Sequence, residues 1–178
     1  MGRARAPAPA ARVVVFRHGP AESRDPARWP DDAERALSAE GLRETRRAAR
    51  GLARALGRVS TLATSPARRA RSTAEVLGAA LDPSRRPTFW PELASGAPAA
   101  PLLPRLVRAA GPGRTVVLVG HAPMLSELVG LALTGDEVPI VRLTKAGAAC
   151  LEFPRGVRAG AAELRWLLTR KQLAETVG

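Results

Sequence analysis

The sequence has 178 residues, which suits one domain with a substantial apolar core. Hydrophobic residues make up 46% of it, a share typical of globular rather than disordered chains. No apolar run approaches the roughly 20 residues that a membrane helix needs, and residues 13–16 are too few for a signal-peptide core. The single cysteine, Cys150, excludes an intramolecular disulfide, and we expect a monomeric, cytoplasmic protein.

The net charge of +12 is compatible with a polyanionic partner such as a nucleic acid. Three features argue against a specific nucleic-acid binder. The basic residues are nearly all arginine in a chain also rich in alanine and proline, which indicates a general compositional bias. Aromatic residues amount to 3% with no tyrosine, so surfaces for base stacking are scarce. The arginines are also spread along the chain, and an acidic protein partner would suit the same charge.

Apolar runs alternate with amphipathic segments along the chain, which predicts a mostly parallel sheet with helices on both faces. We expect a disordered basic tail over 1–11 and, over 12–178, a single α/β domain with three layers, α/β/α. Ser38 and the pair Ser65-Pro66 are expected to start the first two helices. The predicted strands are 12–16, 59–64, 88–90, 115–119, 148–153 and 163–168, and the predicted helices are 38–56, 65–80, a stretch within 98–110, 123–134 and a short C-terminal helix.

The two histidines stand in matching places. His18 follows the apolar run 13–16, and His121 follows the apolar run 116–119. Both runs are typical of short buried strands, so each histidine lies just past the C-terminal end of a strand. In open α/β sheets that edge is where ligands bind. The matching contexts favour one shared site over two unrelated histidines that cap turns.

Arginines accompany these histidines. Arg17 precedes His18, and Arg69, with Arg68 beside it, lies in the first turn of the helix predicted after the second strand. Helix N-termini favour anions, and guanidinium groups match phosphate oxygens in a bidentate fork. Nearby arginine cations also keep an imidazole neutral, and a neutral imidazole is a nucleophile. These residues therefore predict a phosphate pocket with the means for covalent catalysis.

Three motifs in this order resemble the histidine phosphatase (phosphoglycerate mutase-like) superfamily. They are Arg-His-Gly at 17–19, Ser-Pro-x-x-Arg-Ala-x-x-Thr-Ala at 65–74 and Gly-His-x-Pro at 120–123. The short length, with the segments 32–41 and 164–169, is similar to the SixA branch of small phosphohistidine phosphatases. The resemblance extends over roughly residues 12–173 and implies the phosphoglycerate mutase-like fold.

The resemblance implies a role for each motif residue. His18 would be the nucleophile that becomes phosphohistidine, and Arg17 and Arg69 would bind the phosphoryl oxygens. His121 would bind the phosphate too and donate a hydrogen bond to the transferring group. Arg69 rather than Arg68 stands at the arginine position of the motif, which leaves Arg68 as a surface residue. No metal and no cofactor is implied.

The general acid of many superfamily members has no clear counterpart here. Glu92 is the one acidic residue at a plausible place between the second and third motifs, and an exposed loop carboxylate is an equally good interpretation of it. A weak acid matters less for a phosphoramidate, whose nitrogen leaving group can arrive protonated. Pro20 and Ala21 stand where mutases carry other residues, which argues against a sugar-phosphate mutase. Weaker candidates for the acid are Glu22, Asp25, Asp31 and Asp32.

The sequence therefore predicts a metal-independent phosphatase that acts through a phosphohistidine on His18, with a phosphohistidine protein as the favoured substrate. The short chain predicts an open pocket that a protein side chain can reach. One alternative is a phosphatase for small molecules such as a nucleotide, a sugar phosphate or an α-ribazole-type ester. Another is a non-catalytic protein that binds phosphate or a polyanion.

Overall fold

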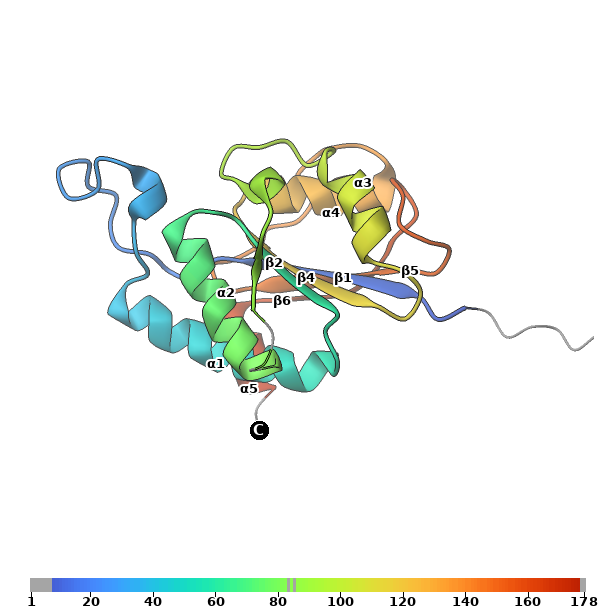
Figure 1. Cartoon of the computed structure of the whole chain (residues 1–178), viewed down its shortest axis with the longest axis horizontal. Coiled ribbons are helices and arrows are strands. Elements are labelled where there is room, and N and C mark those ends of the chain that lie inside the picture. The colour runs from blue at the N-terminus through green and yellow to red at the C-terminus, as the bar shows by residue number, and fades with distance from the viewer. Residues whose placement is uncertain (1–7, 83, 85, 177–178) are drawn as a thin grey trace, which may run out of the picture.

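The computed structural model describes residues 8–82, 84 and 86–176 (Figure 1). In this part of the chain six strands form one sheet in the order β3-β2-β4-β1-β5-β6. The four strands β3, β2, β4 and β1 are parallel, β5 is antiparallel to β1, and β6 is antiparallel to β5. The strands are β1 (Ala11–Arg17), β2 (Thr61–Thr64), β3 (Thr88–Phe89), β4 (Thr115–Gly120), β5 (Ala148–Phe153) and β6 (Glu163–Leu168).

Helices cover both faces of the sheet, so the expected three-layer α/β/α architecture is confirmed (Figure 1). Alternate residues of β1 point to opposite faces, as a strand requires. Val13 and Val15 belong to the core beneath α3 and α4, while Val14 and Phe16 belong to the core beneath α1, α2 and α5. The helices are α1 (Ala39–Leu56), α2 (Arg68–Leu81), α3 (Leu102–Ala109), α4 (Met124–Thr134) and α5 (Arg170–Glu175), and two 3-10 turns are η1 (Asp32–Glu34) and η2 (Pro91–Leu93).

Two details of the predicted elements are wrong. The second helix was expected to start at Ser65, but α2 begins at Arg68, and Ala67 occupies the N-cap position without a side-chain hydrogen bond. Ser65 instead lies in the turn between β2 and α2, where its hydroxyl faces His121. The first strand begins at Ala11, which is buried, so this residue does not belong to the predicted tail. Residues 1–7 of that tail lie outside the described residues.

The capping prediction for the first helix is confirmed, since the Ser38 hydroxyl accepts a hydrogen bond of 2.9 Å from the main-chain N–H of Gly41. Helix α1 also packs closely on the C-terminal helix. A Cβ atom at Gly51, in the middle of α1, would overlap the main-chain carbonyl of Leu173 in α5. The absence of a side chain at this position therefore allows the two helices to meet.

We expect Gly51→Ala to lower the free energy of unfolding by about 1–3 kcal/mol, because backbone must move to admit the new methyl group. Helix propensity alone would give the opposite sign, a gain of about 1 kcal/mol. Urea unfolding of both proteins measures the difference. Gly111→Ala is the matched control, since a Cβ there meets nothing nearer than the Arg114 side chain at 3.8 Å. Equal stability of the two variants would contradict the proposed helix contact.

Candidate active site

His18 follows β1 at the C-terminal edge of the parallel strands. Its main-chain N–H donates to the carbonyl of Gly120 at 3.0 Å, so the end of β1 is held against the end of β4. Its ring Nδ1 lies 2.7 Å from the carbonyl oxygen of Gly19. A carbonyl oxygen only accepts, so this contact places the proton of the neutral ring on Nδ1 and the lone pair on Nε2. Nε2 is therefore the atom available for nucleophilic attack.

His121 lies beside His18, as the sequence predicts. The two ring centroids are 5.0 Å apart, and both side chains are buried. Nε2 of His121 lies 2.9 Å from the hydroxyl of Ser65, which in turn accepts from the main-chain N–H of Ala67 at 3.3 Å. Parallel pairing of the strands thus brings together two histidines that are 103 positions apart in sequence (121 minus 18).

Both histidines are held in the neutral form. Burial, helped by the neighbouring His121, Arg69 and Arg17, lowers the pKa of His18 to about 3 against the opposing effect of the Gly19 hydrogen bond. Burial likewise lowers the pKa of His121 to about 4, with help from Arg69 and Arg17. A nucleophilic imidazole must be unprotonated, so this environment keeps His18 competent at neutral pH.

Arg17 and Arg69 are the two arginines that act on these histidines. Nη1 of Arg17 donates to the carbonyl of Leu143 at 2.8 Å. Nη1 of Arg69 donates to the main-chain carbonyl of Asp32 at 2.6 Å, and Nη2 lies 3.2 Å from the Asp32 carboxylate. In both arginines Nε is buried and has no hydrogen-bond partner among the described residues. Arg68, by contrast, is exposed, as the motif alignment predicts.

A second set of contacts fastens the segments that carry the site. The N–H of Gly19 donates to the Thr73 hydroxyl at 3.0 Å, and that hydroxyl donates to the carbonyl of Arg69 at 2.7 Å. Thr73 therefore joins the nucleophile segment to α2. On the other side the N–H of Ala146 contacts the carbonyls of both Arg17 and His18, at 3.0 and 3.1 Å. The residues that hold the histidines and arginines thus act largely through main-chain atoms.

The structure does not bring Glu92 to the two histidines. Its carboxylate pairs with Nη1 of Arg105 at 3.0 and 2.8 Å, and Arg105 also lies over the ring of Trp90. Hydrogen bonding to its own main chain and to Arg105 lowers the pKa of Glu92, which is the wrong direction for an acid. The geometry favours the loop-carboxylate interpretation. Asp32, one of the weaker candidates, is the carboxylate that contacts a site arginine.

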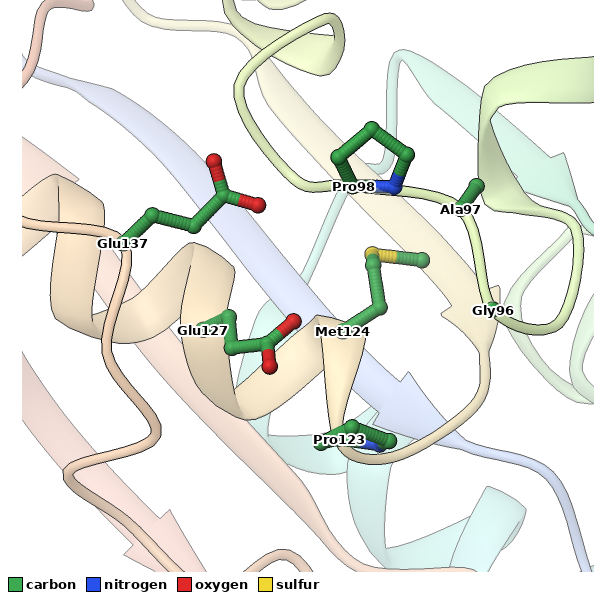
Figure 2. A pocket seen from close by; sticks show the side chains of 7 residues that line it. All are labelled: Gly96, Ala97, Pro98, Pro123, Met124, Glu127 and Glu137. Atoms are coloured by element: carbon green, nitrogen blue, oxygen red, sulfur yellow. The ribbon is translucent and has the colours of Figure 1, made fainter.

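A hollow of about 350 Å³ lies between the start of α4 and the loop at 96–98 (Figure 2). Pro123, two residues after His121, forms its wall toward the end of β4. Glu127 and Glu137 lie on one side of the hollow in Figure 2, and Met124 and Pro98 lie on the other. Glu137 is engaged with the main-chain N–H groups before α3, at 2.6 and 3.2 Å. Neither histidine and neither site arginine is among the residues that line this hollow, and Pro123 is its link to the His121 segment.

Over residues 8–82, 84 and 86–176, no three histidine, cysteine, aspartate or glutamate side chains are grouped so that they could hold a metal ion. Of the helices in the same described part, none combines the length and apolar character needed to cross a membrane.

Comparisons with known proteins agree with the geometry. The family model of the histidine phosphatase superfamily (branch 1) matches residues 13–95. An uncharacterized protein of Picosynechococcus sp. is 36% identical over 155 residues, which cover 86% of this chain and 88% of the relative.

Solved structures extend the likeness to the whole fold. The protein histidine phosphatase SixA in complex with tungstate has a TM-score of 0.77 at 22% identity, over 91% of this chain and 99% of that one. A protein of Nakamurella multipartitia assigned as a phosphohistidine phosphatase SixA has a TM-score of 0.72 at 25% identity, over 90% and 96%. Mycobacterial glucosyl-3-phosphoglycerate phosphatase has a TM-score of 0.68 at 20% identity, over 90% and 99%.

We expect both imidazole groups to stay neutral from about pH 8 to about pH 5, because their pKa values are about 3 and 4. The chain has two histidines, so ¹H–¹⁵N spectra of the ring nitrogens contain two systems to follow. In the unfolded chain both rings take up a proton near pH 6.5, so acidification favours unfolding. The loss of stability amounts to at most about 1.4 kcal/mol per pH unit for each ring. A ring that titrates near pH 6.5 in the folded protein would contradict this account.

Proposed function

Because the chain belongs to the histidine phosphatase superfamily and is an enzyme of that class, we propose that it hydrolyses phosphorylated substrates through a covalent phosphohistidine on His18. One observation carries the proposal. A buried neutral imidazole, with its lone pair on Nε2, lies within the field of two guanidinium groups whose Nε–H has no partner among the described residues. Free, buried N–H donors beside a nucleophile are suited to the oxygens of a transferring phosphoryl group.

In the first step Nε2 of His18 attacks phosphorus. A P–N bond forms, the bond to the leaving group breaks, and its electron pair leaves with that group. Arg17 and Arg69 stabilise the charge on the phosphoryl oxygens. The Ser65 hydroxyl donates to Nε2 of His121, which puts the proton of that neutral ring on Nδ1 as a donor to the transferring group.

The Gly19 carbonyl also prepares the second step. Since it retains the proton on Nδ1, phosphorylation at Nε2 leaves the His18 ring with a positive charge. A cationic ring is a good leaving group for attack by water. The new P–O bond forms, the P–N bond breaks, and the electron pair returns to Nε2. One proton of the water passes to a phosphate oxygen, and the neutral ring is restored.

A phosphohistidine protein is the substrate class that we favour. Asp32 and Glu92 are the candidate general acids. Both have a lowered pKa because hydrogen bonds and arginines stabilise their charged forms. Neither is suited to protonate an alkoxide leaving group. A histidine leaving group needs no such donor when its second ring nitrogen carries a proton from solvent, because the P–N bond then breaks to leave a neutral ring. The net charge of +12 suits an acidic protein partner.

Small phosphomonoesters are the second candidate. One of the similar structures is a glucosyl-3-phosphoglycerate phosphatase, whose substrate is a small molecule, and this observation favours the second candidate. The two candidates differ in the atom that phosphorus leaves, nitrogen in one and oxygen in the other.

We expect radiolabelled phosphoramidate to leave an acid-labile, alkali-stable label on the wild-type protein after quenching. His18→Ala removes Nε2 and should abolish the label. Arg68→Ala is the control, because this exposed arginine neighbours Arg69 without belonging to the site, and it should label as the wild type does. Label that survives in His18→Ala would place the nucleophile elsewhere. A protein that neither labels nor turns over any donor would be a phosphate or polyanion binder.

The leaving-group preference is tested with one peptide that carries either phosphohistidine or phosphoserine at the same position. We expect kcat/KM to favour the phosphohistidine form by about 100-fold or more, since general-acid catalysis of that order is missing for the alcohol. Phosphate release under identical conditions measures both. A preference for the phosphoserine form, or for small phosphomonoesters over both peptides, would favour the second candidate.

A further inference from the structure

Asp32 lies in the loop between β1 and α1 and contacts Arg69, one of the two site arginines. Asp32 opens η1, and the loop lies beyond the C-terminal end of β1 (Figure 1). Two different groups of Asp32 contact the Arg69 guanidinium. The main-chain carbonyl accepts from Nη1 at 2.6 Å, and Oδ2 of the carboxylate lies 3.2 Å from Nη2. Arg69 is thus gripped by one residue that lies 37 positions away in the chain.

A guanidinium has two edges that can hold an oxyanion. The end edge presents one N–H from each Nη, and the side edge presents Nε–H with the other N–H of Nη2. Because the two oxygens of Asp32 contact Nη1 and Nη2, we infer that Asp32 occupies the end edge. The side edge keeps its Nε–H, which is buried and has no partner among the described residues. The end edge of Arg69 would thus hold Asp32, and the side edge would remain for a ligand.

We propose that Asp32 is a positioning residue of the phosphoryl transfer, which holds the end edge of Arg69 so that the side edge meets the phosphoryl oxygens. The inference rests on the proposed function and adds a residue to it. Asp32 touches neither the nucleophile nor the leaving group. Its effect on the rate passes through the orientation of Arg69, where a displacement of about 1 Å can cost about 100-fold.

A second arginine, Arg35, fixes the Asp32 side chain. Its Oδ1 accepts from Nε of Arg35 at 2.9 Å, while Nη1 of Arg35 donates to the carbonyl of Glu22 at 2.9 Å. One carboxylate oxygen therefore serves Arg35 and the other serves Arg69. Asp31 caps η1 through the N–H of Ala33 at 2.8 Å, which fixes the main chain that supplies the carbonyl. The hydrogen bond from Arg35 lowers the pKa of Asp32, so the carboxylate is charged at neutral pH.

Glu34, in the same 3-10 turn, provides a matched control. Its carboxylate pairs with Arg71 at 3.5 Å, and Arg71 lies on α2 two residues after Arg69. Both pairs join η1 to α2, and Arg69 is among the groups that lower the pKa of both histidines. A role limited to docking the loop would be shared by the two carboxylates. A role in positioning Arg69 belongs to Asp32 alone.

The first test compares Asp32→Ala with Glu34→Ala. We expect Asp32→Ala to lower kcat about 10- to 100-fold, while Glu34→Ala stays within about twofold of the wild type. The inhibition constant of inorganic phosphate should not rise in Asp32→Ala, because the lost carboxylate also repels the incoming anion. Asp32→Asn should recover part of the rate, since its amide oxygen still accepts from Nη2. Equal kinetics of the two alanine variants would overturn the inference.

The second test is a double-mutant cycle with Arg69→Lys. A lysine has one ammonium group and therefore lacks the two edges of a guanidinium. If Asp32 acts through Arg69, Asp32→Ala should cost little more in this background, and a full additional loss would overturn the inference. The ¹H–¹⁵N signal of the Arg69 Nε–H, assigned by its absence in Arg69→Lys, reads the same contact without turnover. It should broaden in Asp32→Ala and persist in Glu34→Ala, and an unchanged signal in both would also count against the role.

These readouts distinguish a failure of the proposed phosphatase function from a failure of the positioning role of Asp32. A wild-type protein that forms no phosphoenzyme and shows no turnover defeats the proposed function, whatever the Arg69 signal does. An active wild-type protein in which Asp32→Ala matches Glu34→Ala defeats the positioning role alone.

Discussion

The parallel pairing of β1 with β4, in which Arg17 lies opposite Gly120, is the constraint on which the rest of the site depends. Each strand delivers its histidine one residue later, and the hydrogen bond from the His18 N–H to the Gly120 carbonyl extends the pairing past the end of the ladder. The backbone alone therefore brings the His18 and His121 rings together, with their centroids 5.0 Å apart. Both strands are buried and lie between other strands of the sheet, so the two histidines follow strands that are held on both sides.

Two arginines beside two histidines would be costly to bury without compensation. Main-chain carbonyls of Leu143 and Asp32, together with the Asp32 carboxylate, offset part of that cost, yet each guanidinium keeps a buried Nε–H without a partner among the described residues. The same cations and the same burial explain the neutral histidines. Burial is the larger cause of the neutral histidines, and the arginine cations that add to it would also attract an incoming phosphate, which supports the function that we propose.

Much of this arrangement could be predicted from the sequence, because strand periodicity and a short motif both act locally. The ends of the apolar runs place His18 and His121 at one edge, and the motif distinguishes buried Arg69 from exposed Arg68. The parts that could not be predicted depend on distant contacts. Ser65 is a good N-cap by residue type, but it lies in the turn before α2, where its hydroxyl contacts His121, 56 positions away. Asp32 meets Arg69 across a loop whose path no local pattern specifies.

Glu92 shows why an acidic residue at a suitable place in the sequence is weak evidence for an acid. The sequence allows Glu92 to be either a general acid or a loop carboxylate. The contact that favours the loop carboxylate comes from Arg105, which lies in the next helix, α3. A carboxylate paired with arginine is stabilised in its charged form, and the same holds for Asp32. In a chain with 28 basic and 16 acidic residues, both of these carboxylates pair with arginine, so neither is suited to donate a proton. This is the reason why we propose a substrate whose leaving group requires no proton.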